Sequence, residues 1–241
     1  MLKTQPRRPR GRQNVVKRRL RRIVEFKQAK HESRLMDTVM EHYDGPAGAF
    51  LSLASLLSLH EPLLGHLMKS GRFDCSRFDS ILDVGSGAGQ ILGHLLKLTH
   101  RDASLVAFDL SHEMLKRARA RLKSDRPLYV SGDMTQIPFA DGTFDCVTCG
   151  WVIEHLPDPA PGLSEFARVL KPGGSLLLLA TEDTVQGAFT SRTWKCRTLN
   201  RSDLRRSCES IGLEWKKEFW FTPLHKLVGA GGIVVEAVKK S

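Results

Sequence analysis

The chain has 241 residues, 41% of them hydrophobic, and a formal net charge of +11. This length suffices for one α/β domain with additions and a full hydrophobic core. Its five cysteines are an odd, scattered set, which argues against a disulfide framework and for a reducing compartment, so we expect a cytoplasmic protein.

The N-terminal tail, residues 1–34, carries the whole charge imbalance. It holds 13 of the 37 Lys and Arg but only two of the 26 acids, so the rest of the chain has 24 residues of each sign. Residues 1–12 are rich in Pro and basic residues and are expected to be disordered. Apolar residues at helical spacing from Asn14 predict a short basic amphipathic helix. The neutral remainder is typical of an enzyme rather than of a basic nucleic-acid-binding domain.

Several roles remain open for this tail. A basic amphipathic helix suits a weak contact with an anionic membrane surface, a contact with RNA, or simple exposure to solvent. Residues 1–24 lack acids, as transit peptides do, but they also lack Ser, and we expect no secretory segment. The charge-free run 45–60 is too short and too polar to span a bilayer.

The most informative segment is residues 81–90, which read Ile-Leu-Asp-Val-Gly-Ser-Gly-Ala-Gly-Gln. An apolar run leads into three glycines, and a helical pattern of apolar residues follows from Ile91. This order predicts a strand, a tight turn and a helix N-terminus whose N–H groups can contact a ligand. The G-x-G-x-G spacing differs from the G-x-G-x-x-G of dinucleotide-binding turns, so the loop alone is weak evidence.

Strands and helices alternate after this turn. The second apolar run ends at Asp109, 20 residues after Gly89, where doubly wound folds place an acid that accepts from ribose hydroxyls. Ser111 is predicted to cap the next helix, with Met114 at position N3. The predicted strands, beginning with the one before the glycines, are residues 81–84, 105–108, 128–130, 144–149, 175–180, about 213–222 and about 232–239. Helices are predicted after Ser111, through residues 163–169 and, as the last helix, from Asn200.

Five segments, in order and at matching spacing, resemble class I S-adenosylmethionine (SAM)-dependent methyltransferases, in particular the subfamily acting on small molecules and lipid quinones. They are ILDVGSGAG (81–89), FDLSHEML (108–115), GDMTQIPFADGTFDCV (132–147), EHLPD (154–158) and RVLKPGG (168–174). The resemblance implies an α/β fold: a Rossmann-like doubly wound sheet of seven strands, the last antiparallel, with an N-terminal helical lid. It divides the chain into the tail (1–34), helices that cap the cleft (35–72) and a SAM-binding domain (73–241).

The resemblance also implies SAM as the cofactor. The residues at matching positions are Asp83, Gly85, Ser86, Gly87, Gly89, Asp109, Leu110, Met114, Asp133, Met134 and Gly150. The glycine loop would face the methionine part, Asp83 would orient its amino group, and Asp109 would hold the ribose hydroxyls. Leu110 would lie against the adenine, Asp133 would accept from its amino group, and Met134 would contact the ring.

Simpler roles also suit some of these residues. Asp83 or Asp133 could cap a helix or a turn, and Leu110 and Met114 could be core residues. Gly150, just past the fourth predicted strand, would touch the sulfonium end of SAM with its backbone.

Catalysis needs few special residues in this reaction. Methyl transfer from SAM is a direct displacement, and positioning alone can lower the barrier by about 7–11 kcal/mol. A general base is needed only if the acceptor loses a proton. The resemblance suggests His155, after the fourth strand, with Tyr43 from the lid, although His155 also suits a turn that only packs or caps. No metal is expected, because Cys146 and Cys149 form a C-x-x-C inside a strand and suit buried apolar positions.

The acceptor is poorly specified by the sequence. Gly150-Trp151-Val152 stands where enzymes that methylate amino groups of bases or glutamine carry Asn-Pro-Pro-Tyr, and the aromatic residues of 183–223 suit either a pocket or the core. We predict transfer to a small molecule, lipid-like ones included. One alternative is an RNA or protein methyltransferase guided by the tail; the other is a SAM-binding module without activity. The sequence does not indicate an oligomeric state.

Overall fold

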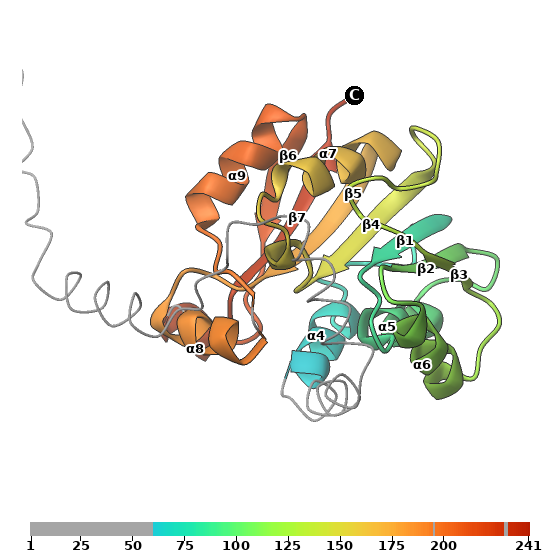
Figure 1. Ribbon diagram of the computed structural model, residues 1–241, viewed down its shortest axis with the longest axis horizontal. Coiled ribbons are helices and arrows are strands. Elements are labelled where there is room, and N and C mark those ends of the chain that lie inside the picture. The colour runs from blue at the N-terminus through green and yellow to red at the C-terminus, as the bar shows by residue number, and fades with distance from the viewer. Residues whose placement is uncertain (1–59, 195, 229–230) are drawn as a thin grey trace, which may run out of the picture.

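The structure is a computed structural model that describes residues 60–194, 196–228 and 231–241. These residues form a seven-stranded sheet in the order β3-β2-β1-β4-β5-β7-β6 (Figure 1). The strands are β1 (Ser80–Val84), β2 (Ser104–Asp109), β3 (Leu128–Ser131), β4 (Phe144–Gly150), β5 (Leu170–Ala180), β6 (Leu213–Glu218) and β7 (Ile233–Lys239). Strand β7 alone runs opposite to the other strands of the sheet, so the predicted doubly wound sheet with an antiparallel last strand is confirmed.

Helices cover both faces of the sheet (Figure 1). One face carries α4, α5 and α6, and the other carries α7 and α9. The helices are α4 (His60–Lys69), α5 (Gln90–Leu98), α6 (His112–Leu122), α7 (Ala160–Val169), α8 (Val185–Trp194), α9 (Arg201–Ser210) and α10 (Pro223–Val228), with a 3₁₀ turn, η1 (Ile153–His155). The central strands are buried on both faces, as expected for parallel strands between helical layers.

The two cysteines of β4 point to opposite faces of the sheet, because side chains alternate along a strand. Cys146 packs into the core beneath α4 and α5, whereas Cys149 packs into the core beneath α7. Side chains three residues apart in a strand point to opposite faces, so this pair can neither form a disulfide nor hold one ion. Both are buried free thiols, as the sequence predicts.

The predicted cap of α6 and the predicted start of α9 are confirmed. The Ser111 hydroxyl accepts a hydrogen bond from the Met114 amide over 3.1 Å, at the start of α6. The Asn200 side chain accepts from the amides of Ser202 and Asp203 over 3.0 and 3.2 Å, at the start of α9. These caps satisfy amides that the first helical turn leaves unpaired.

The C-terminal third differs in detail from the prediction. Strand β6 ends at Glu218 rather than near 222, because the chain turns into α10, which begins at Pro223. Proline suits the first position of a helix, where no amide partner is needed. Helix α9 is therefore not the last, and both α8 and α10 lack a predicted counterpart. Strand β5 begins at Leu170 rather than 175, with a shift in its register against β4.

Much of the N-terminal region lies outside the described residues. This holds for the tail, for residues 35–59 of the predicted capping helices and for Tyr43. The described end of that region is α4, which packs on α5: a Cβ at Gly65 would lie 2.6 Å from the His94 ring. Within the ranges that the structure describes, no helix is long and apolar enough to cross a membrane.

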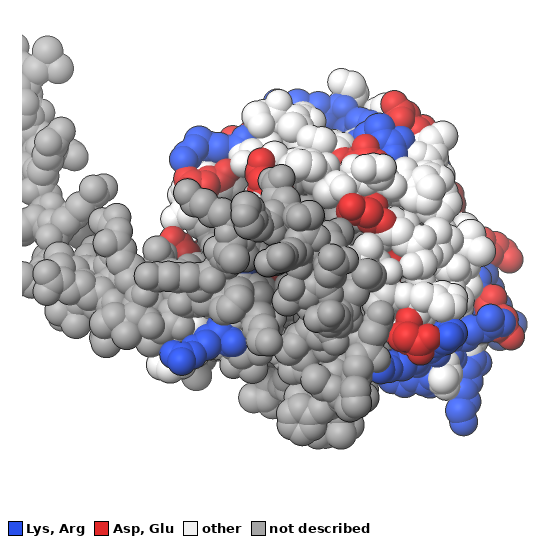
Figure 2. All heavy atoms as spheres, viewed as in Figure 1, with Lys and Arg blue, Asp and Glu red and all other residues white. Residues whose placement is uncertain are grey.

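Basic and acidic side chains are mixed on the described surface (Figure 2). On α6, Lys116 pairs with Glu113 over 2.6 Å. Arg119 of the same helix pairs over 2.6 Å with Asp125, which follows the helix. On α9, Arg205 pairs with Glu209 over 2.8 Å. These helix surfaces therefore carry paired charges, as expected of the neutral part of the sequence.

Candidate active site

The glycine loop between β1 and α5 has a left-handed backbone. Gly85, Gly87 and Gly89 have φ angles of 66°, 52° and 84°. A Cβ at Gly85 would also lie 2.1 Å from the Val152 side chain, which follows β4. The amides of Gly85 and Ser86 donate to the Phe108 carbonyl over 2.7 and 3.1 Å, so the loop is fixed to the end of β2. Glycine is therefore required at position 85 both for its φ and for the close approach of the β4 loop.

Asp109 lies beside this loop. The Gly87 amide donates to Oδ2 of Asp109 over 2.8 Å, and the Ser111 amide donates to Oδ1 over 2.9 Å. One carboxylate thus joins the glycine loop, the end of β2 and the start of α6. This is the position that the sequence assigns to an acceptor for ribose hydroxyls.

Asp83 is a buried acid beneath the loop. Thr148 of β4 donates its hydroxyl to Oδ1 over 2.7 Å, whereas Oδ2 is buried and has no hydrogen-bond partner among the described residues. Burial raises the pKa of Asp83 to about 7, against the smaller opposing effect of the Thr148 hydrogen bond. An unsatisfied buried carboxylate oxygen costs about 1–3 kcal/mol or more, so the position favours a cationic ligand group.

Asp133 is engaged in its own turn. Its Oδ1 accepts from the Thr135 amide over 2.8 Å, and the Gln136 amide donates to its carbonyl over 3.0 Å. The turn-cap role that the sequence left open is therefore present. Met134 packs on the core beneath α7.

Leu110 and Met114 flank the Asp109 side of the loop. The Leu110 carbonyl accepts from the Ser131 hydroxyl over 3.0 Å, and its side chain is partly buried. Met114 is a buried core residue of α6, and a Cβ at Gly87 would lie 3.6 Å from its methyl group. Met114 thus supports the loop from below.

The end of β4 crosses over the glycine loop. A Cβ at Gly150 would lie 2.6 Å from the Ile91 methyl of α5, so this backbone sits directly against the start of the helix. Trp151 follows with a φ of 56°, and its amide donates to the Leu179 carbonyl over 2.8 Å. The sequence predicts neither this contact of Gly150 with α5 nor the left-handed backbone of Trp151; its prediction for Gly150 concerns the sulfonium end of SAM.

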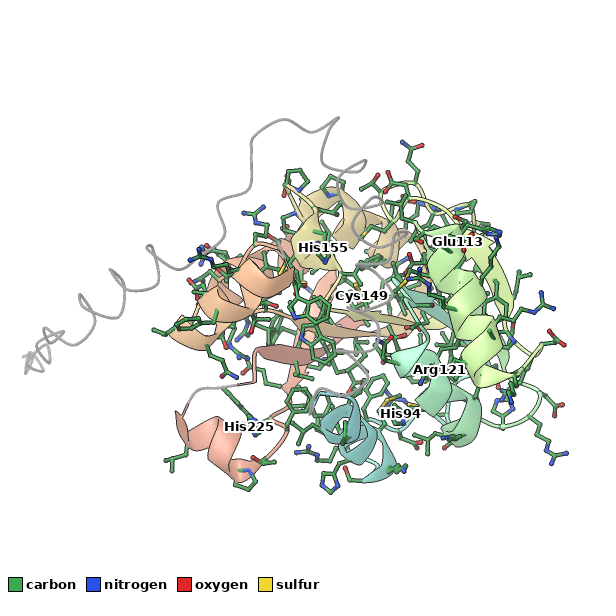
Figure 3. All side chains as sticks on the ribbon, turned by 60° about the horizontal axis from the view of Figure 1, so that its bottom comes forward. His94, Glu113, Arg121, Cys149, His155 and His225 are labelled. Atoms are coloured by element: carbon green, nitrogen blue, oxygen red, sulfur yellow. The ribbon has the colours of Figure 1, made fainter. Side chains whose placement is uncertain are left out.

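His155 lies beyond this crossing, in η1, and is partly buried (Figure 3). Its amide donates to the Val152 carbonyl over 2.9 Å. The preceding residue, Glu154, is buried: its Oε1 accepts from the amide and the hydroxyl of Thr181 over 3.1 and 2.7 Å. Burial raises the pKa of Glu154 to about 7. The glutamate therefore ties η1, and with it His155, to the end of β5.

Sequence reasoning missed several supporting residues. Thr148 is a hydroxyl residue between the apolar residues Val147 and Cys149, and this interruption of the apolar run is a signal that the sequence carries. Arg121 of α6 donates to the carbonyls of Ala88 and Gly89, which closes the loop from the α6 side. A single arginine in a basic helix carries no signal of this role. In the ranges that the structure describes, no group of three His, Cys, Asp or Glu is placed to hold a metal ion.

Comparison with known proteins agrees with this geometry. A family model described as a methyltransferase domain matches residues 82–178, which include the glycine loop, Asp109, Asp133 and β4. Residues 82–178 belong to this methyltransferase domain family. The ubiquinone/menaquinone biosynthesis C-methyltransferase UbiE of Escherichia coli is 32% identical over 147 residues, 56% of this chain and 59% of that enzyme. Alignments with curated relatives span 29% to 59% of the relatives' own length.

Solved structures place the whole fold in the same class. The S-adenosylmethionine-dependent methyltransferase of Mesorhizobium loti has a TM-score of 0.58 at 15% identity, over 69% of this chain and 93% of that one. Magnesium protoporphyrin IX methyltransferase (ChlM) of Synechocystis, with bound SAM, has a TM-score of 0.62 at 14% identity. The match covers 89% of this chain and 100% of that one. The methyltransferase domain thus has the fold of class I SAM-dependent methyltransferases.

Proposed function

We propose that this chain binds SAM and transfers its methyl group to a small molecule, lipid-like acceptors included. The observation that carries the proposal is the arrangement around the glycine loop. There, Asp83 has a buried oxygen without a partner among the described residues, and Asp109 is held against Gly87. An ammonium group suits the first carboxylate, and hydroxyl groups suit the second.

The residues of the site fit the parts of SAM in turn. Asp83 would hold the amino group, the loop Gly85–Gly89 would face the methionine part, and Asp109 would accept from the ribose hydroxyls. Leu110, Asp133 and Met134 would lie on the adenine side, with the remaining oxygen of Asp133 toward the adenine amino group. Met114 would support the glycine loop, which in turn would contact SAM. The Gly150 backbone would lie at the sulfonium end.

Bound SAM supplies an electrophilic methyl group on a good leaving group, so the protein mainly orients the acceptor and excludes water. Where the acceptor atom must lose a proton, His155 is our candidate for the base. It follows the β4 crossing, and Glu154 fixes its turn. Tyr43, from the predicted lid, is the second candidate.

The similarity to UbiE supports a small-molecule acceptor, quinone-like compounds included. We further propose that the protein works in the cytoplasm, without a metal, and that residues 1–34 provide a weak contact with a membrane surface or RNA. The paired charges on α6 and α9 support a small-molecule acceptor over an extended nucleic acid.

Labelled SAM tests this function while the acceptor is still unidentified. The full chain is incubated with methyl-tritiated SAM and an extract of the source cells, which is then separated into small-molecule, lipid, RNA and protein fractions. We expect label in the small-molecule or lipid fraction, also after deletion of residues 1–34. Label in RNA or protein that depends on the tail would contradict the proposed acceptor class. Binding of SAM without label in any fraction would contradict catalysis.

A further inference from the structure

The carboxyl edge of the sheet has two chemically different halves. The ends of β1 and β2 and the turn after β3 carry the acids Asp83, Asp109 and Asp133. The ends of β4 and β6 carry aromatic residues instead, namely Trp151, Phe219, Trp220 and Phe221. The order β3-β2-β1-β4-β5 places the change of direction between β1 and β4, where ligands of doubly wound sheets bind. With the cofactor on the acidic half, the aromatic half is left for the acceptor.

Trp151 has the most unusual backbone on the aromatic half. Among the described non-glycine residues, only Trp151 and Lys123 have a positive φ. Lys123 is the C-cap of α6, where a left-handed residue is common. Trp151 ends no helix, and a bulky residue in this conformation is strained. Such strain persists where the surrounding structure holds it, and it concentrates at functional sites.

The surroundings of Trp151 hold this conformation from three sides. Its amide donates to Leu179 of β5 over 2.8 Å. Gly150 before it is pressed against Ile91, and Val152 after it covers Gly85. The left-handed turn therefore lets the chain cross the glycine loop while it directs the indole toward the end of β6.

The indole meets a fixed aromatic partner there. The rings of Trp151 and Phe221 are stacked with centroids 6.4 Å apart and an interplanar angle of 26°. Phe221 is only 3% exposed and meets His225 edge-on at 6.1 Å. The His225 ring is in turn fixed by the Thr222 hydroxyl, 2.6 Å from Nδ1. We call Trp151, Phe221 and His225 the aromatic wall.

An ion pair stabilises the segment that carries the wall. Trp220, next to Phe221, has its ring over the Arg201 guanidinium at 5.1 Å. Arg201 forms two bonds of 2.8 Å with Glu182, beyond β5, and donates to the Gly232 carbonyl. The Arg72 side chain donates to the Trp220 carbonyl over 3.0 Å. The backbone of this segment is thus anchored independently of any ligand.

We propose that the aromatic wall is the acceptor side of the site and selects a planar aromatic acceptor, with Trp151 as the residue that determines this specificity. The proposal rests on the proposed function, since it takes the acidic half as the SAM side. Planar rings pack against aromatic side chains with a preference over saturated rings of the same size, in offset or edge-on geometry. The left-handed backbone of Trp151 places the indole at the end of β4, next to the Gly150 backbone that would lie at the sulfonium end of SAM.

The test compares two probes with the same bicyclic carbon skeleton and hydroxyl position, one planar and aromatic and the other saturated. Binding of 1-naphthol and of decahydro-1-naphthol to the full chain is measured by calorimetry, with saturating S-adenosylhomocysteine, the demethylated product of SAM. We expect 1-naphthol to bind the unmodified chain at least tenfold more tightly. Trp151→Gly removes the ring and relieves the strained backbone, and Phe221→Leu removes the stacked partner. Each should abolish most of this preference.

Two matched controls separate the wall from general effects. Lys123→Gly replaces the other left-handed residue, and Phe139→Leu removes a ring of the Phe139–Phe144 edge contact in the opposite core layer. Both should keep the preference. Retained binding of S-adenosylhomocysteine shows that each variant is folded. Equal or absent binding of the two probes, or an unchanged preference in both wall variants, would overturn the proposal. Failure of the unmodified chain to bind S-adenosylhomocysteine would instead overturn the proposed function, and the wall with it.

Discussion

The Gly87 amide donates to Oδ2 of Asp109 over 2.8 Å, which joins the glycine loop to the end of β2. A carboxylate has about four lone-pair positions, so Asp109 can keep this bond and accept from ribose hydroxyls at the same time. The glycine loop and the ribose acceptor are therefore positioned together. Little reorganisation is needed at this side of the site when a nucleoside binds.

Gly85→Ala should destabilise the protein far more than Gly71→Ala. Both glycines have a positive φ, 66° and 70°, but a Cβ at Gly71 would meet nothing within 4 Å, whereas one at Gly85 would overlap Val152. We expect about 1 kcal/mol for Gly71→Ala from the backbone alone, and about 3 kcal/mol or more for Gly85→Ala. Urea unfolding measures both. Equal losses would contradict the close approach of the β4 loop to the glycine loop.

Binding of SAM should tighten as the pH rises from 5.5 to 7. The pKa of Asp83 is raised to about 7, so the group carries its proton in the free protein at acidic pH. An ammonium ligand favours the ionised carboxylate, so binding must release a proton, and the Kd should fall by up to about tenfold per pH unit. Calorimetry in buffers of different ionisation enthalpy measures the proton release.

Two variants identify the group responsible. Asp83→Asn should flatten the pH dependence, whereas Glu154→Gln, which removes the other buried acid with a pKa near 7, should leave it unchanged. The same two acids also affect folding. Their pKa values are raised in the folded protein, so the protonated forms favour folding. Their contribution to the free energy of unfolding is therefore present at low pH and is lost as the pH rises toward 7. A pH dependence that disappears in Glu154→Gln and persists in Asp83→Asn would refute the assignment.

The five cysteines should be unreactive in the folded protein. All are buried and free, and burial raises the pKa of Cys75 and Cys208 to about 12 and raises that of Cys149 further. Thiolate is the reactive form, so a disulfide reagent at pH 8 should modify the native chain slowly. After unfolding in guanidinium, the same reagent should modify all five thiols. Rapid modification of one thiol in the native protein would contradict the burial of that cysteine.

His155→Ala tests the candidate base. We expect turnover of an identified acceptor to fall about 100-fold, with the Kd for SAM unchanged, because the proposed role of His155 is to take a proton from the acceptor and not to hold SAM. The control is Lys171→Ala in β5, where Lys171 pairs with Asp145 at the start of β4, the end away from η1; this variant should keep its turnover. A near-normal rate in His155→Ala would leave the histidine with only a packing role in η1.

The apolar runs of the sequence were sufficient to predict the strands in their order along the chain, and the resemblance to class I methyltransferases implied the doubly wound sheet with an antiparallel last strand. The Ser111 cap and the start of α9 at Asn200 were also readable from the local sequence. Helix α8 was not, because VQGAFTSRTW has no apolar stripe and contains a glycine and two threonines. The left-handed Trp151 and the pairing of Asp83 with Thr148 depend on contacts between β1, β4 and β5. Such contacts exist only once the sheet has formed, so no local pattern encodes them.

The most direct test of the account is thermal unfolding of the full chain with SAM and with S-adenosylhomocysteine, beside Asp109→Ala and the control Asp125→Ala. Asp125 is an exposed acid in the loop that follows α6. At about 100 times its Kd, either ligand should stabilise the chain by about 2.7 kcal/mol, a shift of roughly 5–11 °C. We predict that this shift is kept in Asp125→Ala and lost in Asp109→Ala. No shift in the unmodified chain, or an equal shift in both variants, would contradict a SAM site at the glycine loop.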